Sequence, residues 1–222
     1  VITTSNGSLI QKVSVGSLPF GVAVMSTHVY VANFGSPSEV WSFLVSDLSF
    51  KKAVGAPSDG PFSLVVPYTA TARAYASAWN FGVYTLDDGS GDFFAKDNVG
   101  ATGVFGLALD AANNRLFVGN RNSGTIHARD LGAGLPEVFT FTVPSKPYAL
   151  AFNPSTGHLL VVGAETNQLF IYSNAGTLLD TVPLPPQHDL DGQNGGQGIA
   201  VLNNKVYISN YAAGSVTVIN DN

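Results

Sequence analysis

The stretch RLFVGNRNSG, residues Arg115 to Gly124, decides the fold of this chain because copies of it recur along the sequence. The copies are HVYVANFGSP from His28, KVYISNYAAG from Lys205 and, more loosely, HLLVVGAETN from His158. Each joins a short run of β-branched and aromatic residues to a turn rich in Gly, Asn, Pro or Ser, as expected of a strand followed by a tight turn. The recurrence indicates a series of equivalent structural units.

A second apolar run precedes each of these copies and gives the period of the repeat. The runs are PFGVAV, PFSLVV, VFGLAL, PYALAF and GQGIAV, and they begin at residues 19, 61, 104, 147 and 196. The successive spacings of about 42, 43, 43 and 49 residues are typical of a propeller blade with four strands. Five copies are visible, and no segment shows the 3.6-residue periodicity of a helix.

The third copy shows the expected strands most clearly. They are residues 105–110, 115–120, 125–129 and 137–143, with a turn at 111–114. Near-continuous apolar runs such as LALD (107–110) and GVAV (21–24) predict innermost strands that are buried on both faces between neighbouring blades. The alternating residues 139–143 predict an outer strand with one face in solvent.

We therefore predict an all-β fold, a β-propeller that forms a single domain over residues 1–222, with five four-stranded blades. The last copy supplies only three strands, at residues 198–202, 205–211 and 215–219. Residues 8–15 (SLIQKVSV) are predicted to pair with them as the fourth strand, so that the two ends of the chain share the closing blade and no sheet edge stays exposed. A ring of six blades is the alternative.

Composition limits the partners and the compartment of the chain. Only 11% of the residues are charged and 45% are hydrophobic, which leaves Ser, Thr, Asn and Gly to cover the surface and favours an extracellular protein. One N-glycosylation triplet, Asn6-Gly7-Ser8, agrees with secretion. The net charge of -5 and the scattered cations argue against nucleic acid as a partner. No apolar run is long enough to span a bilayer. The absence of Cys excludes catalysis or metal binding by a thiolate. We expect the protein to be a monomer.

The repeats resemble a known group of propeller sequences. VYVANFGSPSEVWSF, RLFVGNRNSGTIHARD and KVYISNYAAGSVTVIN are similar to the YVTN and NHL-type repeats, in which an innermost strand opening with Pro-x-Gly leads to a V-Y-V-x-N second strand. The resemblance covers nearly the whole chain and implies a propeller whose family members include scaffolds, binding modules, lactonases and lyases. The chain departs from the family pattern at Ala78 and Ala164, which stand at positions where the family has Asn. It also differs in size, because propellers of that family typically have six or seven blades.

The propeller register predicts one functional face, because loops before innermost strands and turns after second strands gather at the same end of the blades. The second residues of the innermost strands are Phe20, Phe62, Phe105, Tyr148 and Gln197, and the turns present Phe34, Trp79, Arg121, Glu165 and Tyr211. Aromatic planes with an Arg and a Glu could bind sugar rings or another flat ligand. The alternative for the first set is that the rings only fill the wedges between blades.

One insertion, residues 185–198 (PPQHDLDGQNGGQG), lies on the same predicted face. Asp189, Asp191 and Asn194 supply oxygen ligands at a spacing that partly matches calcium loops, so calcium is a possible cofactor, although a plain surface loop uses the same residue types. His188 with Asp189 or Asp191 could form a base and its orienting carboxylate. His158 follows a turn and is expected to be a solvated histidine.

Two functions follow from these patterns. The first is a secreted, non-catalytic propeller that binds a carbohydrate or protein ligand on its loop face. The second is a lactone hydrolase or lyase that acts at the central channel, with His188, Asp189 and Asp191 as catalytic residues and with a divalent cation as a possible cofactor.

Overall fold

The computed structural model describes residues 11–54, 60–65, 73–87, 93–97, 99, 103–185, 198–210 and 212–222. These residues form antiparallel strands joined by turns, and none of them lies in a helix long and apolar enough to cross a membrane.

The strands follow one another along the chain and pair with their sequence neighbours. The first sheet contains β1 (Pro19–Val24), β2 (His28–Asn33), β3 (Glu39–Leu44) and β4 (Phe50–Val54), and the second contains β5 (Pro61–Val65), β6 (Arg73–Ala78), β7 (Gly82–Asp87) and β8 (Phe93–Asp97). The third contains β9 (Val104–Asp110), β10 (Arg115–Asn120), β11 (Thr125–Asp130) and β12 (Glu137–Thr142). The fourth contains β13 (Pro147–Asn153), β14 (His158–Gly163), β15 (Gln168–Ser173) and β16 (Leu178–Pro183), and the fifth contains β17 (Ile199–Leu202), β18 (Lys205–Asn210) and β19 (Ser215–Asn220).

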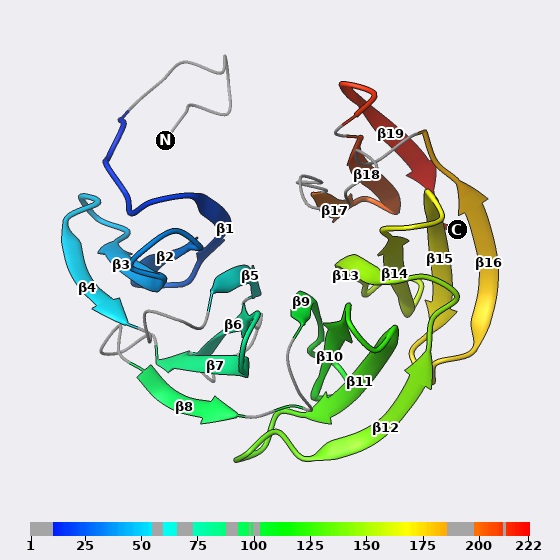
Figure 1. Cartoon of the computed structure of the whole chain (residues 1–222), viewed down its shortest axis with the longest axis horizontal. Helices are drawn as coiled ribbons and strands as arrows, with labels where there is room; N and C mark the ends of the chain where they lie inside the picture. The colour runs from blue at the N-terminus through cyan, green and yellow to red at the C-terminus, as the bar shows by residue number, and fades with distance from the viewer. Residues whose placement is uncertain are drawn as a thin grey trace.

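The five sheets are arranged like blades around a common axis (Figure 1). The strands β1, β5, β9, β13 and β17 lie nearest the axis, and β4, β8, β12 and β16 lie at the rim. The predicted propeller is therefore confirmed, and in the third repeat the observed strands begin and end within one residue of the predicted ones. The predicted alternation of the outer strand is also found, since Phe139 and Phe141 are half-buried while Thr140 and Thr142 are exposed.

The predicted closing blade is wrong. The described residues make four four-stranded blades and a fifth sheet of only three strands, and neither five complete blades nor six are formed. Residues 11–15 of the proposed closing strand are in no strand, and Nε2 of Gln11 donates to the carbonyl oxygen of Asp47, 3.4 Å away in the first blade. Ser8 to Ile10 lie outside the described residues. Figure 1 shows an arc that is open between β1 and the β17–β19 sheet.

Side chains from adjacent blades interlock and form the core. Leu107 and Leu116 of the third blade pack with Tyr75 and Val83 of the second. On the opposite face of the third blade, Gly106 lies so close to the fourth that an added Cβ would be 2.7 Å from the carbonyl oxygen of Tyr148. Burial on both faces explains why innermost strands read as continuous apolar runs.

The first blade departs from this rule. Val22 and Val24 were predicted to be buried, but they are 65% and 59% exposed. Their strand β1 contacts β5 of the second blade on one side only, and the described residues place no sheet against its other side.

Candidate functional site

In the first four blades, the turn that follows the second strand is tied to the residue that leads into the innermost strand of the same blade. The backbone N–H of Phe34 donates to the carbonyl oxygen of Leu18, and that of Trp79 donates to Gly60, both at 3.0 Å. The equivalent N–H of Arg121 donates to Gly103 at 2.8 Å. This bond recurs because the repeats are equivalent, and it places the predicted turn residues and the starts of the innermost strands on one face.

Aromatic rings on this face form a row that crosses blade boundaries, which we call the aromatic shelf. Its members are Phe20, Phe34, Trp79, Phe105 and Tyr148, with Arg121 alongside. The Phe20 and Phe34 rings meet edge to face at 5.9 Å, those of Trp79 and Phe105 at 4.8 Å, and those of Phe105 and Tyr148 at 4.8 Å with a tilt. Between the first two pairs, the Phe34 ring lies over Gly60, where an added Cβ would be 2.9 Å from Cε2 of Phe34 and 3.4 Å from Cβ of Trp79.

The shelf is open at one end and buried at the other. Phe20 and Phe34 are 48% and 36% exposed, and Trp79 is half-buried. Phe105 and Tyr148 are buried in the cluster that joins the third, fourth and fifth sheets. Burial raises the pKa of the Tyr148 phenol to about 12, against a smaller lowering by the Arg121 cation. Phe105 and Tyr148 therefore fill the wedge between blades, and only the Phe20, Phe34 and Trp79 end faces solvent.

Arg121 brings a fixed positive charge to this face. Its guanidinium carbon lies 5.9 Å from the centre of the Trp79 ring and 5.8 Å from that of Phe105, within the range of a cation–π contact. The side chain is half-buried, so the rings hold its position. A planar cation held beside aromatic rings can bind a carboxylate or a backbone carbonyl while the rings contact apolar groups.

Glu165 lies in the predicted turn between β14 and β15, but one residue beyond the position equivalent to Arg121. Pro147 pairs with Gly163, as Val104 pairs with Asn120, and the N–H of Ala164 makes the recurring bond to Lys146 at 2.9 Å. The fourth-blade equivalent of Arg121 is therefore Ala164, and the residue in place of the family's Asn is Gly163. The Asn position was predicted one residue late here because this repeat has Gly where the first, third and fifth repeats have Asn33, Asn120 and Asn210.

Glu165 lies one residue further along, exposed, with Oε1 2.5 Å from Nζ of Lys146. An exposed pair of this kind contributes little to stability, about 0 to 1 kcal/mol.

The other predicted site residues lie outside the described part of the chain. They are Tyr211, Gln197, His188, Asp189, Asp191 and Asn194. The described residues on either side, Pro185 and Gly198, place the two ends of the insertion between β16 and β17, on the face that carries the shelf. Among the described residues, no three His, Cys, Asp or Glu side chains gather as a metal site would require.

The opposite face carries a polar cluster that the sequence patterns did not reveal. Asp221, 3% exposed, accepts hydrogen bonds from Nδ2 of Asn153 at 2.7 Å and from the Thr156 hydroxyl at 2.8 Å, and its Oδ1 lies 2.6 Å from Nδ1 of His158. The expectation of a solvated His158 is therefore wrong. The contacts join residues more than 60 positions apart, which no local pattern could indicate.

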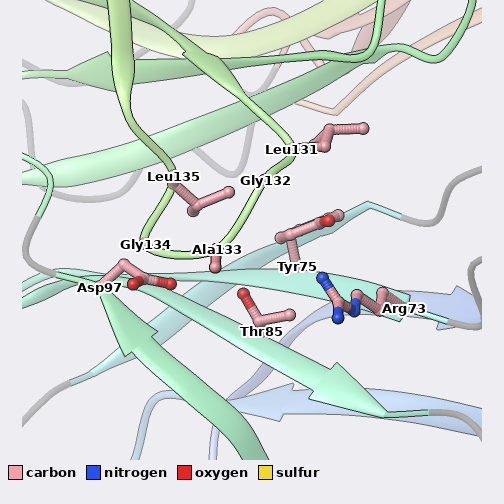
Figure 2. A pocket seen from close by; sticks show the side chains of 9 residues that line it. All are labelled: Arg73, Tyr75, Thr85, Asp97, Leu131, Gly132, Ala133, Gly134 and Leu135. Atoms are coloured by element: carbon pink, nitrogen blue, oxygen red, sulfur yellow. The ribbon is translucent and has the colours of Figure 1, made fainter.

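A shallow pocket also lies at that opposite end of the strands (Figure 2). Arg73, Tyr75, Thr85 and Asp97 of the second blade face the loop from Leu131 to Leu135 of the third blade. Burial raises the pKa of Asp97, against a lowering by its hydrogen bond with Thr85. The pocket is a seam between blades, and it lies apart from the aromatic shelf because β11 begins near Arg121 and ends at this loop.

Comparisons with known proteins support the fold alone. No protein-family model matches the sequence, and a search of curated proteins finds no significant match. Among solved structures, the complex of KlAtg21 with the coiled-coil of AgAtg16 matches with a TM-score of 0.71 and 12% identity, over 100% of this chain and 71% of that chain. Streptogramin B lyase matches with a TM-score of 0.63 and 17% identity, over 92% of this chain and 69% of that one.

The WD40 β-propeller domain of Doa1 matches with a TM-score of 0.69 and 13% identity, over 89% of this chain and 62% of that one. These neighbours include a lyase as well as a WD40 domain, so the similarity does not select an activity. The chain is similar to β-propellers along nearly all of its length, and the propeller architecture is what these comparisons establish.

Proposed function

We propose that this chain is a non-catalytic binding propeller that holds a protein partner on the aromatic shelf. The observation that carries this proposal is the continuity of exposed Phe34 with half-buried Trp79 and Arg121. Trp and Arg are the residue types that contribute most to binding at protein interfaces.

The packing of the shelf also favours tight binding of a partner, because its side chains are held in place before the partner binds. Trp79 is held edge to face against Phe105, and Arg121 lies beside both rings. Side chains that are already ordered lose little conformational entropy when a partner binds. One solved neighbour is a complex of KlAtg21 with the coiled-coil of AgAtg16, which agrees with a protein ligand for a chain of this fold.

A selection experiment with a matched control tests the proposal. A displayed library of random 15-residue peptides is selected on the chain, and binding of the enriched peptides is measured by fluorescence in Trp41→Phe, which leaves Trp79 as the only Trp. We expect Phe34→Ser and Arg121→Ala to weaken binding at least about tenfold, which corresponds to the loss of one hot-spot residue. The control is Phe50→Ser, which removes a 52% exposed Phe from the rim strand β4.

The outcome that contradicts a protein partner is equally specific. Enriched peptides that bind Phe34→Ser and Arg121→Ala as well as they bind the parent, or no enrichment at all, remove the shelf as a peptide site. In that case a panel of soluble glycans, followed through the same Trp79 fluorescence, tests the carbohydrate form of the proposal, in which the Phe34 and Trp79 rings stack on sugar faces.

The repeat type and the location of the protein are part of the same proposal. We assign the repeats to the YVTN and NHL type on the strength of the VYVANFG, RLFVGNR and KVYISNY segments, and we place the protein outside the cell because its surface carries so few charges. Reaction of a secreted sample with a glycosidase that removes N-linked glycans tests both secretion and use of Asn6.

A lyase or lactone hydrolase is the second candidate, because the ends of the insertion lie on the shelf face and one solved neighbour is a lyase. In this version His188 is the base, Asp189 or Asp191 orients it, and Asp189, Asp191 and Asn194 are the candidate ligands of a calcium ion. Turnover of a lactone or streptogramin B substrate that disappears in His188→Ala supports it. Unchanged turnover in that variant removes His188 from the mechanism.

A further inference from the structure

We propose that the two end sheets of the arc are docking faces for two further blades of the same repeat type, which complete the ring. The inference starts from equivalent residues in different blades. Val22 pairs with Val31, as Leu107 pairs with Val118 and Leu150 with Val161. Leu107 and Leu150 are 1% and 7% exposed because each packs against the preceding blade, whereas Val22 is 65% exposed.

The last sheet presents the complementary face. Val216 of β19 pairs with Ser209 and is 61% exposed, and Val218 beside it is 52% exposed. Every described equivalent of Val216 in the other blades has 0% exposure: Val40, Val83, Ile126 and Leu169. The free face of β19 therefore has the composition of a buried blade interface and lacks only its neighbour.

A polar contact also recurs, between the third and fourth and between the fourth and fifth sheets, and its partners are missing at the two ends of the arc. The second strand of every blade begins with a basic residue, and the set is His28, Arg73, Arg115, His158 and Lys205. Arg115 donates from Nη1 to the carbonyl oxygen of Asn174 in the next blade, at 3.1 Å, and His158 contacts Asp221 of the next blade. Arg73 lines the seam with the loop of the next blade, as Figure 2 shows.

Lys205 holds this position in the last sheet and is exposed. At the other end of the arc, Asp47 lies in the turn between β3 and β4, where a preceding blade would bring its basic residue. Its carboxylate accepts a hydrogen bond from the backbone N–H of Ser49, and this lowers the pKa of Asp47. The missing blades are therefore expected to present an acceptor toward Lys205 and a basic residue toward Asp47.

The size of the missing part comes from the solved neighbours. The match with the KlAtg21 complex spans all 222 residues of this chain and 71% of the matched chain. Dividing 222 by 0.71 gives a length of about 310 residues for the matched chain. The same division gives about 300 residues for streptogramin B lyase and about 320 for the Doa1 domain. The shortfall of about 75 to 100 residues is two blades of about 43 residues. Residues 1–10 and 186–197 are too short to supply them.

An extension built from this chain's own repeat tests the proposal. A copy of residues 132–183 is added after Asp221, and a second copy of residues 143–183 follows it. The added residues 132–142 supply the fourth strand of the fifth sheet, and the two copies of residues 143–183 supply two blades. Because the chain has no Cys, Val22→Cys and Val216→Cys can each be labelled alone with a thiol reagent. We expect both to react rapidly in the 222-residue chain and at least about tenfold more slowly in the extended chain, in line with burial of the two faces.

The control is Val138→Cys, a 50% exposed position on the rim strand β12, which should react equally in both chains. Rapid labelling at Val22→Cys and Val216→Cys in both chains overturns the proposal, provided that circular dichroism shows added strand content. Slow labelling in the 222-residue chain, together with a dimeric mass in light scattering, assigns the faces to a second copy and also overturns it.

A second measurement does not depend on the extension folding. In the 222-residue chain, Val22→Lys and Val216→Lys should leave the Tm within about 2 °C of the parent and lower aggregation, since an unoccupied face loses no contact. Ile126→Lys, at the position equivalent to Val216 inside the arc, should abolish cooperative unfolding. A large fall in Tm for Val22→Lys or Val216→Lys would show that the chain itself covers these faces.

Discussion

Asp221, the last residue but one, holds His158 of the fourth blade through a contact of 2.6 Å between Oδ1 and Nδ1. The carboxylate also accepts from Asn153 and Thr156, so a single buried side chain joins the end of the fifth sheet to the turn between β13 and β14. Removing it leaves buried donors without an acceptor, which costs about 1 to 3 kcal/mol.

This contact should make the free energy of unfolding depend on pH in the acidic range. Burial raises the pKa of Asp221, but the hydrogen bonds of His158, Asn153 and Thr156 outweigh it and the net shift is downward. A depressed carboxyl pKa contributes stability that is present above the unfolded value of about 4 and is lost as the pH falls through the folded value. We expect Asp221→Asn to lower the Tm at pH 7, and the difference from the parent to shrink toward pH 3, as measured by circular dichroism. Asp180→Asn, at an exposed carboxyl, is the control, and a difference that stays constant from pH 7 to pH 3 would contradict this assignment.

Two buried tyrosines should respond differently to loss of their hydroxyl groups. The Tyr30 hydroxyl donates to the carbonyl oxygen of Asp87 in the next blade, at 3.0 Å, whereas the buried Tyr172 hydroxyl has no hydrogen-bond partner among the described residues. Tyr30→Phe should destabilise the protein by about 1 kcal/mol, and Tyr172→Phe should be neutral or stabilising. Urea unfolding of the two variants side by side checks this, and equal losses would show that both hydroxyl groups are bonded.

Alkaline titration should separate Tyr148 and Tyr172 from exposed tyrosines. Burial raises the pKa of each phenol to about 12. A phenol whose pKa is raised on folding contributes stability that is present below about pH 10 and is lost as the pH rises through the folded value. Tyr148→Phe should therefore reduce the loss of stability between about pH 10 and pH 12, and should remove one late-ionising group from the absorbance change near 295 nm. Ionisation of all tyrosines together near pH 10 in the folded protein would contradict it.

Close packing between blades should make Gly106 sensitive to the smallest substitution. A Cβ at this position would lie 2.6 Å from Cδ1 of Leu150 and 2.7 Å from the carbonyl oxygen of Tyr148. Because the backbone of the fourth blade would have to move, we expect Gly106→Ala to cost about 2 to 3 kcal/mol. Gly198→Ala is the matched control, since the nearest atom to its Cβ would be the Ser209 Oγ at 3.5 Å. Equal Tm values for the two variants would mean that the blades can separate without cost.

Much of the fold could be predicted from the sequence because a strand and its turn are local features. The alternation of the outer strand and the turn residues at 111–114 lie within a few positions of one another, and the repeat multiplies each weak signal five times. The site was predicted less completely. Trp79 and Arg121 do lie together beside Phe105, and Glu165 lies in its predicted turn. In the fourth repeat, however, Gly163 and not Ala164 holds the position of the family's Asn, so Glu165 lies one residue beyond the equivalent of Arg121. Whether any of these residues binds a ligand remains a prediction.

By itself, the sequence determined the unit: a four-stranded sheet of about 43 residues whose innermost strand is apolar on both faces. Only the tertiary structure decided which sheet faces are covered by a neighbouring blade and which are exposed. Val22 reads like Leu107 in sequence, yet one is exposed and the other buried, because burial depends on a neighbouring sheet and not on the strand's own residues. For the same reason, the bond between His158 and Asp221, 63 residues apart, could be found only once the fourth and fifth sheets were placed side by side.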